Sequence, residues 1–160
     1  MEKLQVPKIK NYMITSLVKL NSNMDVYESI DLLLKNKISG APVVDESGHL
    51  IGVLSERDCL RIMANGSFHE LPGGVVNDYM SKNIQTLHVD DDIFQAADTF
   101  LHHKFRRIPI VDKKNRLVGQ ISRRDVLRAI QDAAKSAKIE KYPSKYLSPQ
   151  MKASLGEKQK

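Results

Sequence analysis

The sequence predicts an α+β fold in which one unit of helix, strand, strand and helix is used twice. Three observations predict it. Shifted by 67 positions, the chain matches itself without a gap over residues 12–63, with 17 identities. Each copy also has apolar residues at helical spacing, and each then has two short apolar runs around a turn. A repeat of fixed period is one supersecondary unit, and each copy needs the other to bury its apolar face.

Each copy opens with a predicted amphipathic helix. Four apolar residues recur at i, i+4, i+7 and i+8, which is the spacing of one helical face. They are Val26, Ile30, Leu33 and Leu34 in the first copy, and Ile93, Ala97, Phe100 and Leu101 in the second. Asp25 and Asp92 stand directly before them. A carboxylate there accepts free backbone amides and suits the helix dipole, so we expect each helix to begin at this aspartate.

A β-hairpin and a second helix follow in each copy. The runs that flank the two turns are residues 41–44 and 50–54 in the first copy, and 108–111 and 117–121 in the second. Short apolar runs bounded by turn residues are typical of strands. We expect the second helix to begin after Ser55 in the first copy and after Ser122 in the second. A short helix over residues 75–80 should lead into the second copy, mirrored near residues 9–13.

The length of 160 residues is that of one domain. We divide it into a first repeat at 6–64, a linker at 65–74, a second repeat at 75–135 and a basic extension at 136–160. Of the net charge of +6, +4 lies in residues 138–160, so the repeats are nearly neutral. We expect the extension to be a solvated, flexible appendage and do not expect nucleic-acid binding. A lysine-rich tail that binds nucleic acid or protein, with the repeats as a dimerisation scaffold, is the alternative.

Several classes of protein are not indicated. The single cysteine, Cys59, cannot form an internal disulfide, and the apolar runs are too short for a signal core or a membrane span. We therefore expect a cytoplasmic protein. No histidine has a Cys, Asp or Glu partner at metal-ligand spacing, so no metal is expected. The sequence shows neither a nucleophile–base pair nor a glycine-rich phosphate loop, so we expect no enzyme activity and no cofactor.

The paired segments resemble a known family. Residues 38–45 with 50–58 read ISGAPVVD and LIGVLSERD, and residues 105–112 with 117–125 read FRRIPIVD and LVGQISRRD. Both pairs resemble the CBS domain, named for cystathionine β-synthase, and the resemblance covers residues 6 to about 135. It implies two copies packed by their sheets around a pseudo-twofold axis, with two clefts. It also implies adenine-nucleotide or related adenosyl ligands, regulatory rather than catalytic roles, and homodimers.

The Ser-x-x-Asp signature of each copy has two interpretations. Ser55 with Asp58, and Ser122 with Asp125, have the spacing of an N-terminal capping box, which could account for all four residues. In the second interpretation the carboxylate accepts the hydroxyls of a ribose, while the serine and the free amides face phosphate oxygens. The resemblance supports the second interpretation, because the acid at this position typically holds the ribose in family members.

The two clefts are predicted to differ. The cleft at Asp125 has Arg106 and Arg107 before its proline, and guanidinium groups bind phosphate bidentately. The cleft at Asp58 has serine and glycine at those positions, so a phosphorylated ligand should prefer Asp125. Family members often carry a threonine on the first strand, where Thr86 fits but Lys19 departs. The predicted ligand-binding residues are Asp125, Ser122, Arg124, Arg106, Arg107, Ile108, Ile38, Ser39, Asp58, Ser55 and Thr86, with Ile38 and Ser39 helping to enclose the base at Asp125.

The sequence therefore favours a regulatory module that senses an AMP-, ADP- or ATP-like nucleotide. It would signal to an unidentified partner protein by a change of conformation or of dimer geometry, since a ligand shifts an equilibrium only when it binds one arrangement better. A small hydrolase or transferase is the enzyme alternative, and turnover of a nucleotide would favour it. The sequence does not distinguish AMP, ADP, ATP, S-adenosylmethionine and dinucleotides from one another.

Overall fold

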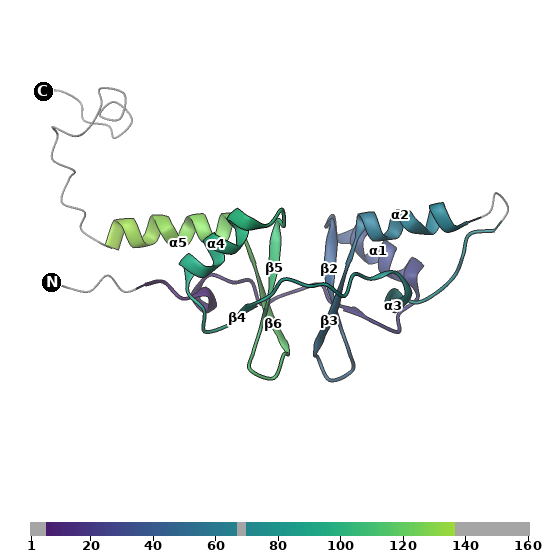
Figure 1. Cartoon of the computed structure of the whole chain (residues 1–160), viewed down its shortest axis with the longest axis horizontal. Coiled ribbons are helices and arrows are strands. Elements are labelled where there is room, and N and C mark those ends of the chain that lie inside the picture. The colour runs from purple at the N-terminus through teal and green to yellow at the C-terminus, as the bar shows by residue number, and fades with distance from the viewer. Residues whose placement is uncertain (1–5, 67–69, 137–160) are drawn as a thin grey trace, which may run out of the picture.

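The molecule has two halves, each with a three-stranded sheet and its own helices (Figure 1). The computed structural model describes residues 6–66 and 70–136. The two hairpins lie side by side in the middle of the molecule, and the long helices lie on the outer sides (Figure 1). Among the described residues, no helix is both long and apolar enough to cross a membrane.

The elements follow the predicted order, with a two-residue strand added before the first helix of each copy. The first copy contains η1 (Ile9–Asn11), β1 (Leu20–Asn21), α1 (Val26–Asn36), β2 (Gly40–Val44), β3 (Leu50–Ser55) and α2 (Glu56–Asn65). The second contains α3 (Val76–Tyr79), β4 (Leu87–His88), α4 (Ile93–His102), β5 (Arg107–Val111), β6 (Leu117–Ser122) and α5 (Arg123–Ser136). The predicted α+β repeat, the two hairpins and the short helices before each copy are confirmed.

The helix starts have the expected chemistry. The side chain of Asp25 accepts hydrogen bonds from the amides of Tyr27 and Glu28. Asp92 forms a capping box with Gln95, in which each side chain bonds the other residue's amide. These bonds satisfy amides that the first turn of a helix leaves without partners, so α1 and α4 begin where the sequence predicts.

Each sheet has the same strand order. The first runs β1-β2-β3 and the second β4-β5-β6, with the short strand parallel to the middle strand and the hairpin antiparallel. At the end of each hairpin, the first residue of one strand faces the last residue of the other. Gly40 pairs with Ser55, and Arg107 pairs with Ser122. The hairpins therefore carry their pre-proline residues to the start of the following helix.

The leading segment of each copy, before its first strand, packs against the sheet of the other copy. Ile9 is fully buried in the core of the second sheet, and Val76 in the core of the first. The backbones of Ser81 and Val53 exchange two hydrogen bonds of 2.9 and 3.0 Å. The purple N-terminal segment accordingly lies beside the green second half in Figure 1. The two repeats are thus interleaved, and neither core is complete without residues from the other copy.

Two glycines allow this interleaving. A Cβ added to Gly119 would lie 2.6 Å from Sδ of Met13 and 3.1 Å from the carbonyl oxygen of Ile14. Gly52 has the equivalent relation to Met80 in the other half. The crossing segment therefore lies directly on the strand, and only a residue without a side chain leaves room for it.

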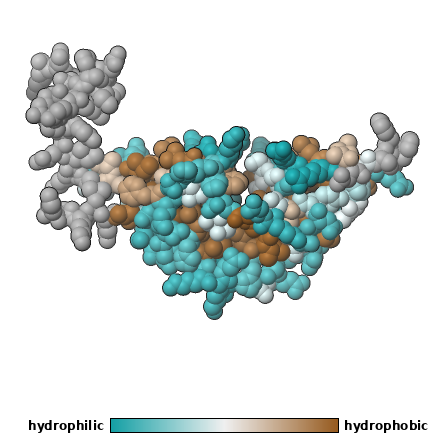
Figure 2. Space-filling model, in the orientation of Figure 1, coloured by the Kyte–Doolittle hydropathy of each residue, from teal (hydrophilic) through white to brown (hydrophobic). Residues whose placement is uncertain are grey.

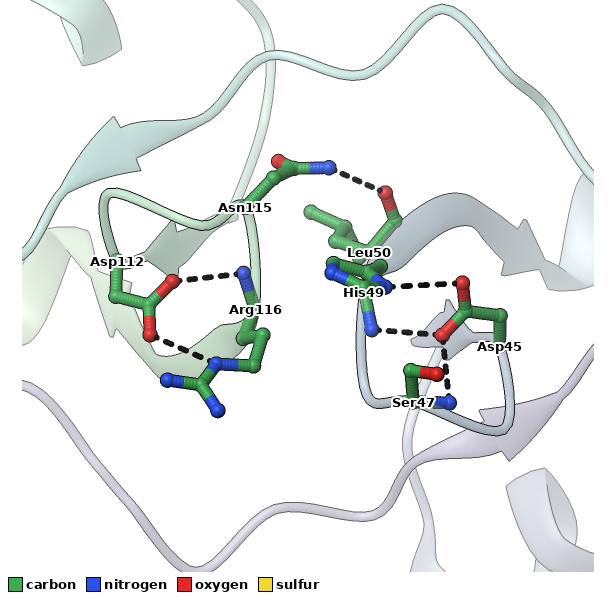
Figure 3. A network of polar contacts seen from close by, with 7 residues as sticks. All are labelled: Asp45, Ser47, His49, Leu50, Asp112, Asn115 and Arg116. Carbon is green, nitrogen blue, oxygen red and sulfur yellow. Dashed lines mark hydrogen bonds and ion pairs between the residues drawn. The ribbon is translucent and has the colours of Figure 1, made fainter.

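The hairpin turns join the two halves at their tips (Figure 3). The amide of Leu50 donates to the carbonyl of Asn115, and the amide of Leu117 donates to the carbonyl of Gly48, both at 3.0 Å. The side-chain amide of Asn115 also donates to the carbonyl of Leu50 at 3.2 Å. The first two bonds are equivalent under the 67-residue repeat, as a pseudo-twofold relation between the copies requires.

Candidate functional site

A cavity of about 710 Å³ opens at the start of α5. The first residue of strand β5 and the last residue of strand β6 line the cavity, and α5 forms one of its sides. The lining residues are Ile14, Arg107, Ser122, Arg124, Asp125, Leu127, Arg128 and Gln131. The pairing of Arg107 with Ser122 at the end of the hairpin is what places a guanidinium beside the helix start. The structure therefore brings together four residues that the sequence predicts for one site, namely Arg107, Ser122, Arg124 and Asp125.

Asp125 lies at the bottom of this site and is 3% exposed. Its Oδ2 accepts hydrogen bonds from the amide and the hydroxyl of Ser122, both at 2.7 Å. The amide of Asp125 in turn donates to Oγ of Ser122 at 3.3 Å. Its other oxygen, Oδ1, forms an ion pair with the guanidinium of Arg128. In this structure both carboxylate oxygens already have partners from the protein.

The first copy has the same arrangement at the start of α2. Asp58 is buried and accepts from the amide and the hydroxyl of Ser55 at 2.9 and 2.8 Å. Arg61 pairs with the other oxygen of Asp58 at 3.6 Å. The capping-box interpretation of Ser-x-x-Asp is therefore confirmed in both copies. The ligand-binding interpretation of the same residues stays a prediction.

The arginines near the start of α5 have different surroundings. Arg107 and Arg124 are exposed and line the cavity. Arg106 is also exposed but lies outside the lining, one residue before β5. Arg123 lies over the ring of Phe100, with its guanidinium carbon 6.0 Å from the ring centre. The cations available to a ligand in the cavity are therefore Arg107, Arg124 and Arg128.

Ile108 and Thr86 do not line the cavity. Ile108 is fully buried in the core of the second sheet, so its side chain holds β5 in place and only its backbone is close to the site. Thr86 is half-buried and directly precedes β4. Both residues were predicted to contact ligand, and that role stays a prediction.

Ile38 and Ser39 belong to the other half of the molecule. The carbonyl of Ser39 accepts from the amide of Glu56 at 2.9 Å, and the next residue pairs with Ser55. Both residues therefore lie at the start of α2, near Asp58, which differs from the prediction that they help enclose a base at Asp125. The first copy instead reaches the Asp125 cavity through Ile14, because its leading segment crosses to the second sheet.

Four lining residues were not predicted: Ile14, Leu127, Arg128 and Gln131. The sequence did carry a signal for Arg128, which follows Asp125 by three residues and is repeated as Arg61 three residues after Asp58. Residues three apart are neighbours on a helix, so this pairing could be expected. Ile14 carries no such signal, because the 67-residue match does not show which copy a segment packs against.

A second cavity of about 400 Å³ shares two residues with the first. It is lined by Asn11, Tyr12, Met13, Ile14, Arg128 and Asp132. The hydroxyl of Tyr12 donates to Oδ2 of Asp132 at 3.2 Å, which ties the crossing segment to α5. Partial burial raises the pKa of Tyr12, and the hydrogen bond to Asp132 raises it further. The phenol therefore stays protonated at neutral pH and acts as a donor.

Two further chemical features concern possible metal ligands and the cysteine. Residues 6–66 and 70–136 contain no cluster of three His, Cys, Asp or Glu side chains able to hold a metal. Burial raises the pKa of Cys59, and the charges of Asp58 and Glu56 raise it further. Burial and the two neighbouring carboxylates therefore disfavour the thiolate of Cys59.

The CBS domain family matches residues 9–65 and 76–132, which are the two copies of the repeat. The chain belongs to the CBS domain family. The predicted family and its fold of two tandem CBS repeats are thereby confirmed. The chain is 34% identical over 125 residues to inosine-5'-monophosphate dehydrogenase of Aquifex aeolicus. That match covers 78% of this chain but only 24% of the dehydrogenase.

Two of the similar solved structures are complexes with a nucleotide. The structure of CBSX2 in complex with AMP has a TM-score of 0.69 and 28% identity, and the match covers 80% of this chain and 98% of that one. CBSX2 is a CBS-pair protein from Arabidopsis thaliana. The cytosolic domain of the Mg²⁺ channel MgtE in complex with ATP has a TM-score of 0.65 and 28% identity, and the match covers 76% of this chain and 48% of that one.

Proposed function

We propose that this CBS pair is a non-catalytic regulatory module that binds an adenine nucleotide in the cavity at Asp125. The observation that carries the proposal is the convergence of one buried carboxylate, three guanidinium groups and two apolar side chains on a single opening. A nucleotide presents hydroxyls, phosphates and a flat base, and these groups match that set of side chains. The complexes of CBSX2 with AMP and of MgtE with ATP support the same class of ligand.

Each part of the ligand has a partner in the cavity. We assign the ribose hydroxyls to Asp125, because a carboxylate accepts hydrogen bonds from hydroxyl donors. Arg107 and Arg124 take the phosphate, which they can bind bidentately while remaining charged. Ile14 and Leu127 provide apolar surface for the base. The ligand would thus bridge the hairpin, α5 and the segment that crosses from the first copy.

The cavity at Asp125 should bind phosphate better than the equivalent site at Asp58. Gly40 stands where the second copy has Arg107, and Ser39 where it has Arg106. The start of α2 keeps Arg57 and Arg61 but lacks a guanidinium at the beginning of its hairpin. Removing one charge-assisted contact to a phosphate costs about 1.5–3 kcal/mol.

We further propose that the protein is a cytoplasmic homodimer that contacts its second copy through its outer helices. Large apolar side chains are exposed on four helices, and the space-filling view shows apolar surface along the top of the molecule, where the long helices lie (Figure 2). They are Leu34, Leu60, Met63, Phe94, Leu101, Leu127 and Ile130. Such a set of exposed apolar residues favours burial against another protein surface. Because α5 carries both the cavity and part of this surface, a ligand at Asp125 could change the dimer geometry and so signal to a regulated partner protein.

The proposal is tested by isothermal titration calorimetry with AMP, ADP, ATP and S-adenosylmethionine. We expect at least one of them to bind, and a variant lacking residues 138–160 to bind it equally well. That deletion also tests the adaptor alternative, whose lysine-rich tail lies outside the described residues. Salt-dependent nucleic-acid binding that is lost with the tail, together with no binding of any adenosyl ligand, would contradict the sensor function.

A further inference from the structure

We propose that Arg128 acts as a guard, meaning a side chain that covers one carboxylate oxygen of Asp125 until a ligand displaces it. The guard makes the cavity selective for phosphorylated nucleosides over nucleosides. The inference rests on the proposed function and adds a specificity-determining residue to it. Arg128 pairs with Oδ1 of Asp125, which is the oxygen that Ser122 leaves free. Any hydroxyl that is to reach this oxygen has to move the guanidinium aside.

The guard can move because its two partners are unequally buried. The side chain of Asp125 is 5% exposed, whereas that of Arg128 is 62% exposed. The carboxylate is fixed by two hydrogen bonds from Ser122 at the first turn of α5. The guanidinium lies on a long, solvated side chain that can change rotamer without disturbing the core. Ligand entry therefore displaces Arg128 and leaves Asp125 in place.

A displaced Arg128 side chain can take up a second position beside other charged groups. It lines both cavities, so its guanidinium lies at the boundary between them. Asp132 lies four residues further along α5 and therefore on the same side of the helix. A phosphate bound by Arg107 and Arg124 would also be within the cavity that Arg128 lines. The displaced guanidinium can thus leave the carboxylate of Asp125 and pair with the phosphate of the ligand. Asp132 lies one turn further along α5.

This exchange favours nucleotides. A nucleoside that binds Asp125 breaks the ion pair with Arg128 and supplies no anion in return. A nucleotide breaks the same pair but replaces it with a phosphate, so its net cost is smaller. Because charge-assisted hydrogen bonds are among the stronger polar contacts, we expect the nucleotide to be preferred by about tenfold or more.

The first copy shows a weaker form of the same pair. Arg61 is 3.6 Å from Asp58, and Asn65 stands in the sequence where the second copy has Asp132. That arginine has no second carboxylate one turn further along its helix. The arginine with two nearby carboxylates therefore occurs at the cavity that Arg107 also lines. This arrangement and Arg107 together point to a phosphorylated ligand at Asp125.

The test compares adenosine with AMP by calorimetry on the parent, on Arg128→Gln and on Arg128→Lys. With Arg128→Gln we expect adenosine to bind about tenfold more tightly, because it no longer has to break an ion pair. The affinity for AMP should change much less, because the lost ion pair and the lost phosphate contact offset each other, so the preference for AMP over adenosine should fall about tenfold. Arg128→Lys should retain part of this preference. Arg116→Gln is the matched control, because Arg116 also pairs with an aspartate, Asp112, but lies outside both cavities. It should bind both ligands like the parent.

An equal change in both affinities, or no change in either, would overturn the role of Arg128 while leaving the proposed function intact. If the parent binds none of AMP, ADP, ATP and S-adenosylmethionine, the proposed function fails, and the role of Arg128 fails with it. Circular dichroism of each variant checks that the fold is unchanged, as expected for a side chain that is mostly solvated.

Discussion

Ile14 and Gln120 exchange two backbone hydrogen bonds, of 2.8 Å from the amide of Ile14 and 2.9 Å from the amide of Gln120. The first residue lies in the leading segment of the first CBS repeat, before β1, and the second lies in β6 of the other repeat. The leading segment of the chain thus pairs with the outer strand of the second sheet through an isolated β-bridge. Since Ile14 also lines the cavity at Asp125, the site is built by both copies.

The close approach of this segment makes Gly119 intolerant of a side chain. Gly119→Ala should lower the free energy of unfolding by about 1–3 kcal/mol, because the new Cβ would overlap Met13 and the backbone of Ile14. Urea denaturation measures the change. Gly73→Ala is the control, since a Cβ there has nothing within 4 Å. Equal stability of the two variants would contradict the interleaved packing.

Substitution of the serine in each Ser-x-x-Asp sequence tests helix capping and ligand binding separately. Ser55→Ala and Ser122→Ala should each lower the free energy of unfolding by about 1 kcal/mol, because each removes the side chain that caps a helix. Only Ser122→Ala should also change the affinity for AMP, since Ser122 lines the larger cavity. If the two variants lose equal stability and neither changes AMP affinity, Ser122 has a capping role alone.

The aspartates of the hairpin turns should make stability depend on acidic pH (Figure 3). Hydrogen bonds from the amides of His49 and Arg116 hold the pKa of Asp45 and of Asp112 below the ordinary value of 3.8. A depressed pKa stabilises the fold above the ordinary value, and this contribution is lost as the pH falls through the folded-state pKa. The double variant with Asp45→Asn and Asp112→Asn should lose less stability between about pH 5 and pH 2.

Urea denaturation across this range checks the prediction, with Asp31→Asn, an exposed position on α1, as the control. Asparagine keeps the side-chain oxygen that accepts the turn amides, so the variant changes the titration more than the turn. A parent and a double variant with parallel stability curves below pH 5 would show that these turns do not contribute.

The exposed apolar residues of α2 should be needed for self-association. Leu60→Glu with Met63→Glu places two charges on this surface and should shift the protein from dimer to monomer, because a buried unpaired carboxylate is costly. Sedimentation velocity measures the change. Asn77→Glu on α3, outside this surface, should leave the dimer intact. A parent that is monomeric at all concentrations would refute the proposed dimer.

Local chemistry made much of this fold predictable. Asp25 and Asp92 marked the helix starts, and the runs around Pro42 and Pro109 marked the hairpins, because capping and strand patterns act over a few residues. The position of Ile14 was not predictable in this way, since its contacts come from the other copy. Ile38 and Ser39 were assigned to the Asp125 cleft for the same reason, although they lie beside Ser55.

The candidate site was predicted in part. Asp125, Ser122, Arg107 and Arg124 meet at one cavity, as the sequence indicated. The capping role of Asp125 was one of the two interpretations of the sequence, because the same carboxylate can cap a helix, pair with an arginine and accept a ribose. The helix amides, the arginine and the ribose compete for this carboxylate. The sequence shows that these partners exist but not which of them binds most strongly.

The central claim is tested most directly by titrating AMP into two matched variants, Asp125→Ala and Asp58→Ala. Both remove a buried capping aspartate, so they should lose similar stability, and circular dichroism should show that both remain folded. We predict that Asp125→Ala abolishes measurable AMP binding, while Asp58→Ala binds it like the parent at one site. Loss of binding in Asp58→Ala with parental binding in Asp125→Ala would contradict the account.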